Sequence, residues 1–312
     1  MISILCKIFS GVAVTLLCIT ILLTSKDSLH LNVAQAAAAP YNYDLVQWHA
    51  SNFLSKWAHF LRRTFPGQKL SENEKLQRLK EYFQLSREAE QLASRLNTYT
   101  VHFDQTSNLD LKELTTRSLE INSRRHSLRN DVEETIEATI SSVLAEEKLT
   151  YWREALFPPV DIRLTDPPAV LVTSTRDRIS RIHDVLLNST ISLQEREQIE
   201  EYLLNKHNIS AIVLNVGGVA TYPASLPNSR TLRSTLQISA HEWLHHYLFF
   251  KSLGQNYWET SEMQILNETF ANIAGIEIGD RAFQTLIDSA KHEQIEIIYH
   301  TNSDNLDNEN SF

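Results

Sequence analysis

Residues 232–250 read LRSTLQISAHEWLHHYLFF, and this stretch decides the fold of the second half of the chain. Apolar residues recur in it every three or four positions, the spacing that gives a helix one apolar face. That face comprises Leu232, Leu236, Trp243, Tyr247 and Phe250. The pattern predicts an amphipathic helix, and Gly254 is the predicted C-terminal stop.

The helix carries two histidines four positions apart, His241 and His245, with Glu242 between them. Side chains at this spacing project from the same side of a helix, so the two imidazoles suit adjacent corners of a zinc tetrahedron. Glu242 lies where it can take a proton from a water on the metal without ligating the metal itself. The stretch therefore predicts a water-activating metal site.

A second helix is predicted downstream, opened by Ser261 with Gln264 in a capping-box pattern and ended by Gly279. Glu268 lies on this helix, on one face with Ala271, Asn272 and Gly275. The small residues at 271 and 275 would let that face lie close to the first helix, so Glu268 is the preferred third ligand. The other downstream candidates are Glu259, Glu262, Glu277, Asp280, His292 and His300.

The motif H-E-x-x-H at 241–245, followed by N-E-T-F-A at 267–271, resembles the gluzincin clan of zinc peptidases. The resemblance implies a zincin-like catalytic domain that holds one Zn²⁺ ion, with the two histidines and Glu268 as ligands. It also implies that Glu242 is the general base in peptide-bond hydrolysis. One departure is Asn272, where thermolysin-like members carry an aspartate.

Weaker predictions surround the metal ligands. Asn272, one turn after Glu268, can accept a hydrogen bond from a ligating imidazole and fix its tautomer. Gly217, Gly218 and Tyr222 belong to a predicted exposed strand that would bind a peptide by strand addition; an ordinary glycine turn is the equal alternative. The oxyanion stabiliser stays open among five residues: Tyr222, Tyr257, His292, Tyr299 and His300.

The rest of the chain predicts an α+β fold in which a small mixed sheet and the active-site helix pair follow a helical region. The helical region covers residues 41–150 and contains an antiparallel hairpin at 70–150; the catalytic domain covers 151–300. Within that domain, strands are predicted at 160–164, 169–173, 210–216 and 219–222, and a helix at 193–206.

The N-terminus contains a nearly uninterrupted apolar run from Ile8 to Leu23, long enough to span a bilayer with slight tilt. Residues 1–25 therefore predict a membrane anchor or a cleaved signal peptide. The anchor is favoured because the nearest small-x-small site, residues 34–36, lies far beyond the apolar core. Lys7 would leave the N-terminus in the cytoplasm and place the catalytic domain outside. Residues 26–40 are a predicted linker and 301–312 a disordered tail.

The amino-acid composition excludes some classes of binding partner and of zinc site. The net charge of −9 argues against nucleic acid, and the only cysteines, Cys6 and Cys18, lie in the apolar run, so no later Cys-ligated zinc site exists. The sequence thus predicts a membrane-tethered zinc peptidase that acts on peptides or proteins. If residues 1–25 are cleaved as a signal peptide, the protein is predicted to be secreted. The alternative is a membrane-anchored helical interaction protein with a structural or latent zinc site.

Overall fold

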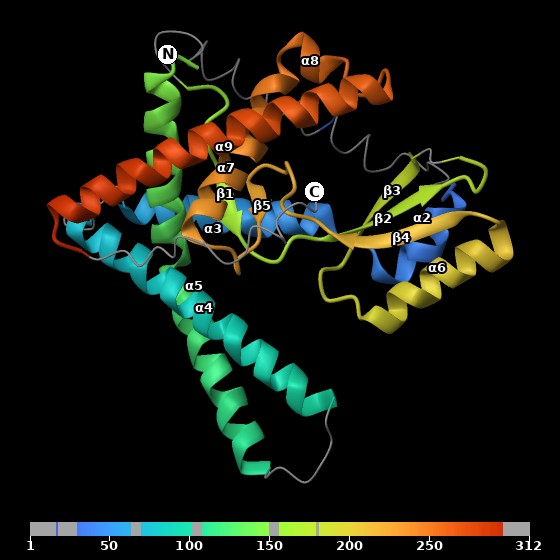
Figure 1. Cartoon of the computed structure of the whole chain (residues 1–312), viewed down its shortest axis with the longest axis horizontal. Coiled ribbons are helices and arrows are strands. Elements are labelled where there is room, and N and C mark those ends of the chain that lie inside the picture. The colour runs from blue at the N-terminus through green and yellow to red at the C-terminus, as the bar shows by residue number, and fades with distance from the viewer. Residues whose placement is uncertain are drawn as a thin grey trace.

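The computed structural model describes residues 17, 30–63, 70–101, 108–149, 156–178 and 181–295. In these ranges the protein is α+β and mostly helical (Figure 1), which confirms the predicted fold class at that level. The helices are α2 (Val33–Ala38), η1 (Ala39–Tyr41), α3 (Leu45–Arg63), α4 (Glu72–Val101), α5 (Asn108–Glu146), α6 (Leu193–His207), α7 (Leu232–Phe249), α8 (Ser252–Gln255) and α9 (Ser261–His292). The strands are β1 (Ile162–Leu164), β2 (Ala169–Ser174), β3 (Arg181–Leu187), β4 (Ser210–Asn215) and β5 (Ala224–Leu226).

Helices α4 and α5 form the predicted hairpin, and its far end projects from the body of the molecule (Figure 1). Apolar side chains spaced three or four residues apart are buried at the near end of the hairpin, where Leu79, Val132, Ile136 and Ile140 are each 0% exposed. Burial of such a stripe is the main source of stability for long helices. α5 also packs against α7 and α9, so the hairpin supports the helix pair that carries the candidate site.

The strands form two small sheets. β1 pairs in parallel with β5, while β2 is the centre of an antiparallel sheet in the order β3-β2-β4. β3 was not predicted from the sequence. The predicted strand at 219–222 is wrong in position, because only Val219 forms an isolated bridge, to Ser225, and the strand itself is β5.

Two separate hydrophobic clusters hold the fold together. The larger one joins the α4–α5 hairpin, the parallel strand pair, α7 and α9. The smaller one lies between the antiparallel sheet, α6 and α2, with Ala34 and Ala38 buried in it. Part of the predicted linker 26–40 is therefore a folded helix packed against a sheet.

Helices α7 and α9 lie against each other along most of their length, and glycines permit this approach. A Cβ on Gly275 would meet the His241 backbone at 3.0 Å, and one on Gly279 would lie 2.4 Å from the Gln237 Cα. Gly279 was predicted to end the second helix, but α9 continues to His292. The residue is a contact point between two helices instead of a stop.

No helix in the described ranges is long and apolar enough to cross a membrane. The apolar run at 8–23 lies outside the described residues except for Leu17, as does the predicted tail at 301–312. Predictions of an anchor, a signal peptide and a disordered tail therefore remain predictions.

Candidate metal centre

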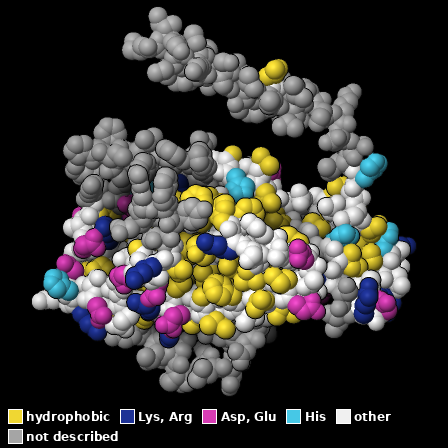
Figure 2. Space-filling model, turned by 90° about the horizontal axis from the view of Figure 1, so that it is seen from above, with side chains coloured by type: hydrophobic (Ala, Val, Ile, Leu, Met, Phe, Trp, Pro, Cys, Tyr) yellow, Lys and Arg dark blue, Asp and Glu magenta, His cyan; other side chains and the backbone are white. Residues whose placement is uncertain are grey.

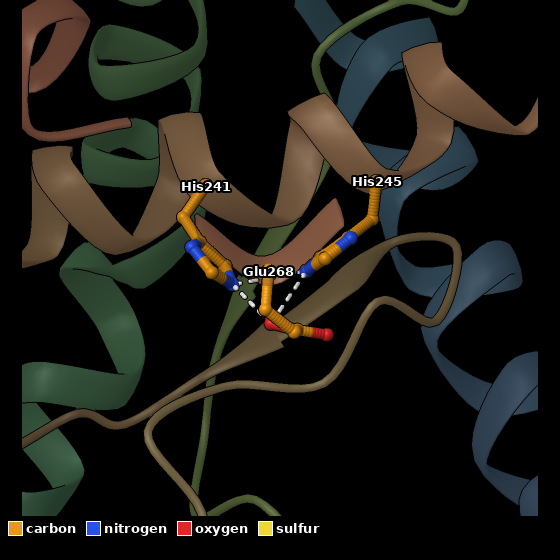
Figure 3. Close-up of side chains that lie close together, drawn as sticks. All are labelled: His241, His245 and Glu268. Atoms are coloured by element: carbon orange, nitrogen blue, oxygen red, sulfur yellow. Dashed lines mark hydrogen bonds and ion pairs between the residues drawn. The ribbon is translucent and has the colours of Figure 1, made fainter. Parts of the chain in front are cut away.

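α7 begins after Thr231, whose side chain accepts a hydrogen bond from the Ser234 backbone N–H, and it carries both histidines on the side that faces α9. Figure 3 shows the His241 and His245 rings converging on the Glu268 carboxylate from α9. The Nε2 atoms of the two rings are 3.0 Å apart. Glu268 Oε2 is 3.7 Å from the first and 3.5 Å from the second.

These three distances test whether the residues fit zinc. Ligand atoms about 2.0–2.2 Å from a tetrahedral ion are separated from one another by about 3.3–3.5 Å. The observed separations of 3.0, 3.5 and 3.7 Å bracket that range. Two imidazoles and one carboxylate are also a donor set typical of catalytic zinc. The three side chains therefore fit one zinc ion.

An amide side chain on α9 orients the ring of His245. His245 Nδ1–H donates a hydrogen bond to Asn267 Oδ1 at 2.9 Å, which leaves Nε2 as the ligating atom. Asn267 is only 2% exposed and also donates from Nδ2 to the Leu253 carbonyl. The Asn272 side chain and the Ala271 backbone lie near the His241 ring and favour its charged form, while the predicted hydrogen bond from His241 to Asn272 stays a prediction. This role of Asn267 was not predicted from the sequence, although the residue directly precedes Glu268 in the motif.

Burial and neighbouring charges shift the pKa values of the three side chains in different directions. Burial, reinforced by the charge of His245, lowers the pKa of His241 to about 4, which keeps this imidazole neutral. Burial also opposes a charge on His245, but its pKa is raised because Glu268 lies within hydrogen-bonding distance. Burial would raise the pKa of Glu268, yet its hydrogen bond and charge interaction with His245 outweigh that effect and lower it. The carboxylate is therefore anionic beside two rings.

Glu242 lies on the inner side of α7, with 5% of its surface exposed, and burial raises its pKa to about 7. Its carboxylate lies against Gly218, because a Cβ built there would be 2.4 Å from Oε1. The glycine at 218 was predicted to admit a substrate backbone. In the structure its missing side chain makes room for the Glu242 carboxylate.

The predicted substrate segment, residues 217–222, is a loop next to this carboxylate. The ring of His246 contacts that of Tyr222 edge-to-face, with the ring centroids 5.4 Å apart. Tyr222 is 44% exposed, and its hydroxyl donates to the Pro159 carbonyl. The neighbouring α3 contributes His49, whose Nδ1 lies 3.0 Å from the Tyr222 carbonyl oxygen. Part of the loop backbone is therefore already engaged.

A cavity of about 340 Å³ opens beside the Glu268 carboxylate. Tyr257 lines it and donates its hydroxyl to Glu268 Oε1 at 3.0 Å. Burial and the neighbouring Glu268 charge raise the pKa of Tyr257 to about 12, so the phenol keeps its proton. Of the five oxyanion candidates, Tyr257 is hydrogen-bonded to this carboxylate, while His292 is at the far end of α9. Tyr299 and His300 lie outside the described residues.

A second cluster of ligand-type side chains joins His59 of α3 to Asp131 and Glu134 of α5. His59 Nε2 lies 3.7 Å from Asp131 Oδ1 and 3.2 Å from Glu134 Oε2. Arg78 forms an ion pair with the same aspartate. A cation already neutralises that carboxylate, so the cluster is better explained as an ionic contact between helices.

Comparison of the chain with protein-family models, with curated proteins and with solved structures finds no match.

Proposed function

We propose that the protein is a zinc-dependent peptidase of minimal gluzincin type, with one Zn²⁺ held by His241, His245 and Glu268. The observation that carries the proposal is the convergence of these three ligand atoms within 3.0–3.7 Å of one another, next to the buried Glu242 carboxylate. A structural zinc site closes with a fourth protein ligand, whereas catalytic sites use three. Among the described residues this cluster contains three.

When bound, zinc polarises a peptide carbonyl and lowers the pKa of a bound water toward neutrality. The chain's own residues supply the rest. Glu242 accepts the proton of the attacking water and passes it to the leaving amine, because its pKa near 7 suits both steps. Asn267 holds His245 in the ligating tautomer. Tyr257 donates a hydrogen bond at the metal site and is our candidate for stabilising the oxyanion.

We further propose that the apolar run at 8–23 tethers the protein to a membrane, with the catalytic domain on the extracytoplasmic side. Support comes from the length of that run. The segment between this run and the folded part of the chain is short, because the run ends at Leu23 and α2 begins at Val33. α2 packs into the smaller hydrophobic cluster. The substrate would then be a peptide or protein near that membrane surface, and the net charge of −9 disfavours nucleic acid.

The second candidate is a membrane-anchored interaction protein in which the zinc site is structural or latent. Exposed apolar surface favours it. Leu111 and Leu119 are 45% and 67% exposed on the projecting hairpin, and Ile265 and Ile273 are 65% and 67% exposed on α9. Figure 2 shows hydrophobic side chains gathered on the face seen from above.

One experiment separates the two. The full chain is purified in detergent, its zinc content is measured, and hydrolysis of a mixed peptide library is compared with that of Glu242→Gln. We expect one zinc per chain in both proteins and a loss of about 10²–10⁴-fold in hydrolysis in the variant. Stoichiometric zinc without cleavage of any peptide would sink the peptidase proposal and leave the interaction protein. Equal hydrolysis by both proteins would remove Glu242 as the base.

A further inference from the structure

The cavity beside Glu268 has one basic side chain in its wall, Arg181 at the start of β3. The opposite wall belongs to the first half of α9 and the segment before it, including Tyr257, Gln264 and Asn272. Arg181 thus comes from the antiparallel sheet, while the metal ligands come from the helix pair. The cavity is formed where these two parts of the molecule meet.

Arg181 is held in a fixed orientation at this wall. Its Nε lies 2.7 Å from Asp184 Oδ1 and its Nη2 2.6 Å from Asp184 Oδ2, a bidentate pair. A guanidinium has five N–H donors, and Asp184 takes up two of them. The side chain is 56% exposed, so a ligand in the cavity can reach it.

The guanidinium of Arg181 lies close enough to the candidate metal site to interact with the charge of Glu268. The pKa of Arg181 is raised, mainly by its hydrogen bond to Asp184 and also by the charges of Asp184 and Glu268. In our proposed function the Glu268 charge is engaged by zinc. Arg181 then lines the cavity as a cation with three N–H donors beyond the two that Asp184 takes up, and arginine recognises carboxylates through such donors.

We infer that Arg181 binds a substrate carboxylate beside the metal, either the free C-terminal carboxylate of a peptide or an acidic side chain next to the cleaved bond. This inference rests on the proposed peptidase function and deepens it by naming the substrate class. Asp184 positions the guanidinium, and Gln264 and Asn272 offer amide hydrogen-bonding groups on the facing wall. Arg181 is a specificity-determining residue in this assignment.

The test measures binding instead of turnover. Zinc-loaded full-length Glu242→Gln is titrated by calorimetry with two pairs of N-acyl tripeptides. One pair differs only in a C-terminal carboxylate or amide. The other pair is amidated and differs only in a Glu or Gln side chain. We expect at least one carboxylate-bearing peptide to bind about tenfold or more tightly than its neutral partner, and the pair that shows the difference identifies the source of the carboxylate.

Variants assign the preference to Arg181. Adding Arg181→Gln should reduce the ratio of affinities to about one while the zinc content and the affinity for the neutral peptide stay unchanged. Arg181→Lys, which keeps the charge without the fork, should retain part of the preference. The matched control is Arg233→Gln, which removes an arginine of similar exposure with the same bidentate geometry, to Asp280, outside the cavity. It should keep the full preference.

The outcomes distinguish this inference from the function on which it rests. Equal binding of charged and neutral peptides, binding of neither, or a preference that survives Arg181→Gln overturns the inference. Cleavage of neutral peptides by the unmodified protein would at the same time leave the peptidase proposal intact. An Arg181-dependent carboxylate preference without any cleavage would support the binding site and refute the peptidase.

Discussion

The absence of a side chain at Gly218 leaves room for the Glu242 carboxylate. A Cβ there would lie 2.4 Å from Oε1 and 3.0 Å from Ile238 Cγ2, and Ile238 and Glu242 are both buried. We therefore expect Gly218→Ala to displace the carboxylate and to cost about 1–3 kcal/mol of unfolding free energy through overpacking. Peptide hydrolysis should fall more than tenfold while zinc content is kept, as measured by turnover and metal analysis.

Ala220→Ser, at an exposed position in the same loop, is the control and should leave hydrolysis nearly unchanged. If Gly218→Ala hydrolyses peptides at the unmodified rate, the Glu242 carboxylate does not act from the position seen here.

Asn267 fixes one ligand through a single hydrogen bond. Replacing it by Ala removes the acceptor for His245 Nδ1–H, so the ring can rotate and change tautomer. We expect the zinc affinity of Asn267→Ala to fall about 10–100-fold, the usual effect of losing a partner that orients a ligand. Competition with a zinc chelator measures this change. Glu277→Gln, exposed on the same helix, should leave the affinity unchanged, and an equal loss in both variants would contradict the assignment.

At the residue scale, helical spacing was enough to predict which three candidate ligand side chains meet. His241, His245 and Glu268 follow from the four-residue step on one helix and the small-residue face on the other. Contacts outside helical spacing could not be predicted. Tyr257 reaches Glu268 from a turn before α9, and Arg181 reaches the same cavity from a distant strand. Neither approach leaves a periodic signal in the sequence.

Packing between α7 and α9 decides whether Gly279→Ala raises or lowers the unfolding free energy. Glycine inside a helix normally costs about 0.5–1 kcal/mol relative to alanine, so Gly279→Ala would stabilise an isolated α9. In the protein the new Cβ would lie 2.4 Å from Gln237 Cα and 2.6 Å from its backbone N, and backbone atoms cannot rotate away. We expect a net loss of about 1–3 kcal/mol in unfolding free energy, measured by chemical denaturation.

The control for that prediction is Thr285→Ala on the exposed side of α9, where only helix propensity acts and a small change is expected. If Gly279→Ala is more stable than the unmodified protein, then α7 and α9 can move apart to admit the Cβ without a loss of unfolding free energy.

An ion pair joins the same helices and should make their association depend on pH. The Arg233 hydrogen bond lowers the pKa of Asp280 below its ordinary value of 3.8, and Gln237 adds to this effect against a smaller opposing effect of burial. The folded state then binds fewer protons, so this stabilisation is present above that value and is lost as pH falls through the lowered pKa. It amounts to at most about 1 kcal/mol because the pair is largely exposed.

Asp280→Asn should therefore be less stable than the unmodified protein at pH 7, and the two should converge as the pH falls below about 4 in thermal unfolding. Asp177→Asn, exposed in the turn after β2, controls for charge alone. A difference that is constant across pH would show that the carboxylate's ionisation is not involved.

Elements were predicted best where the signal is local. The hairpin helices, α6, α7, β2 and β4 lie close to their predicted ranges because periodicity and capping set them. Gly279 was taken as a helix end because a glycine that terminates a helix and one that admits a neighbouring helix look alike in sequence. The strand predicted before Pro223 instead lies after it, as β5. Its position is set by pairing with β1, about 60 residues earlier in the chain, and a contact between distant segments leaves no local signal in the sequence.

At the scale of the whole molecule, residues 33–63 join the two hydrophobic clusters. α2 is buried in the smaller one, and the chain after it pairs with β3, since Tyr43 N–H donates to the Leu186 carbonyl. α3 then reaches the larger part, where Lys56 pairs with Glu137 of α5 and with Asp161 before β1. These contacts could not be predicted from the sequence, because ion pairs between distant segments have no spacing rule.

Lys56 is the strongest test of this connection. Lys56→Met keeps the stem but leaves the carboxylates of Glu137 and Asp161, 21% and 26% exposed, without their common cation. Breaking such a pair costs up to about 3–5 kcal/mol when the remaining charge is fully buried. The two carboxyl groups are partly exposed, and burial raises the pKa of Glu137 to about 8, so this group can take up a proton when its cation is removed. Both effects reduce the loss. We expect a loss of about 2–4 kcal/mol in unfolding free energy and faster proteolysis within residues 45–63.

Lys75→Met is the matched control, because Lys75 pairs with the 69%-exposed Glu72 one turn away on the same helix. Such a pair contributes less than about 1 kcal/mol, so stability and proteolysis should barely change. Adding Glu137→Gln to Lys56→Met replaces one of the two carboxyl groups that have lost their cation and should restore part of the loss. If the double variant is as unstable as the single one, then α3 is held by its other contacts, and the connection between the two clusters does not depend on the Lys56 ion pairs.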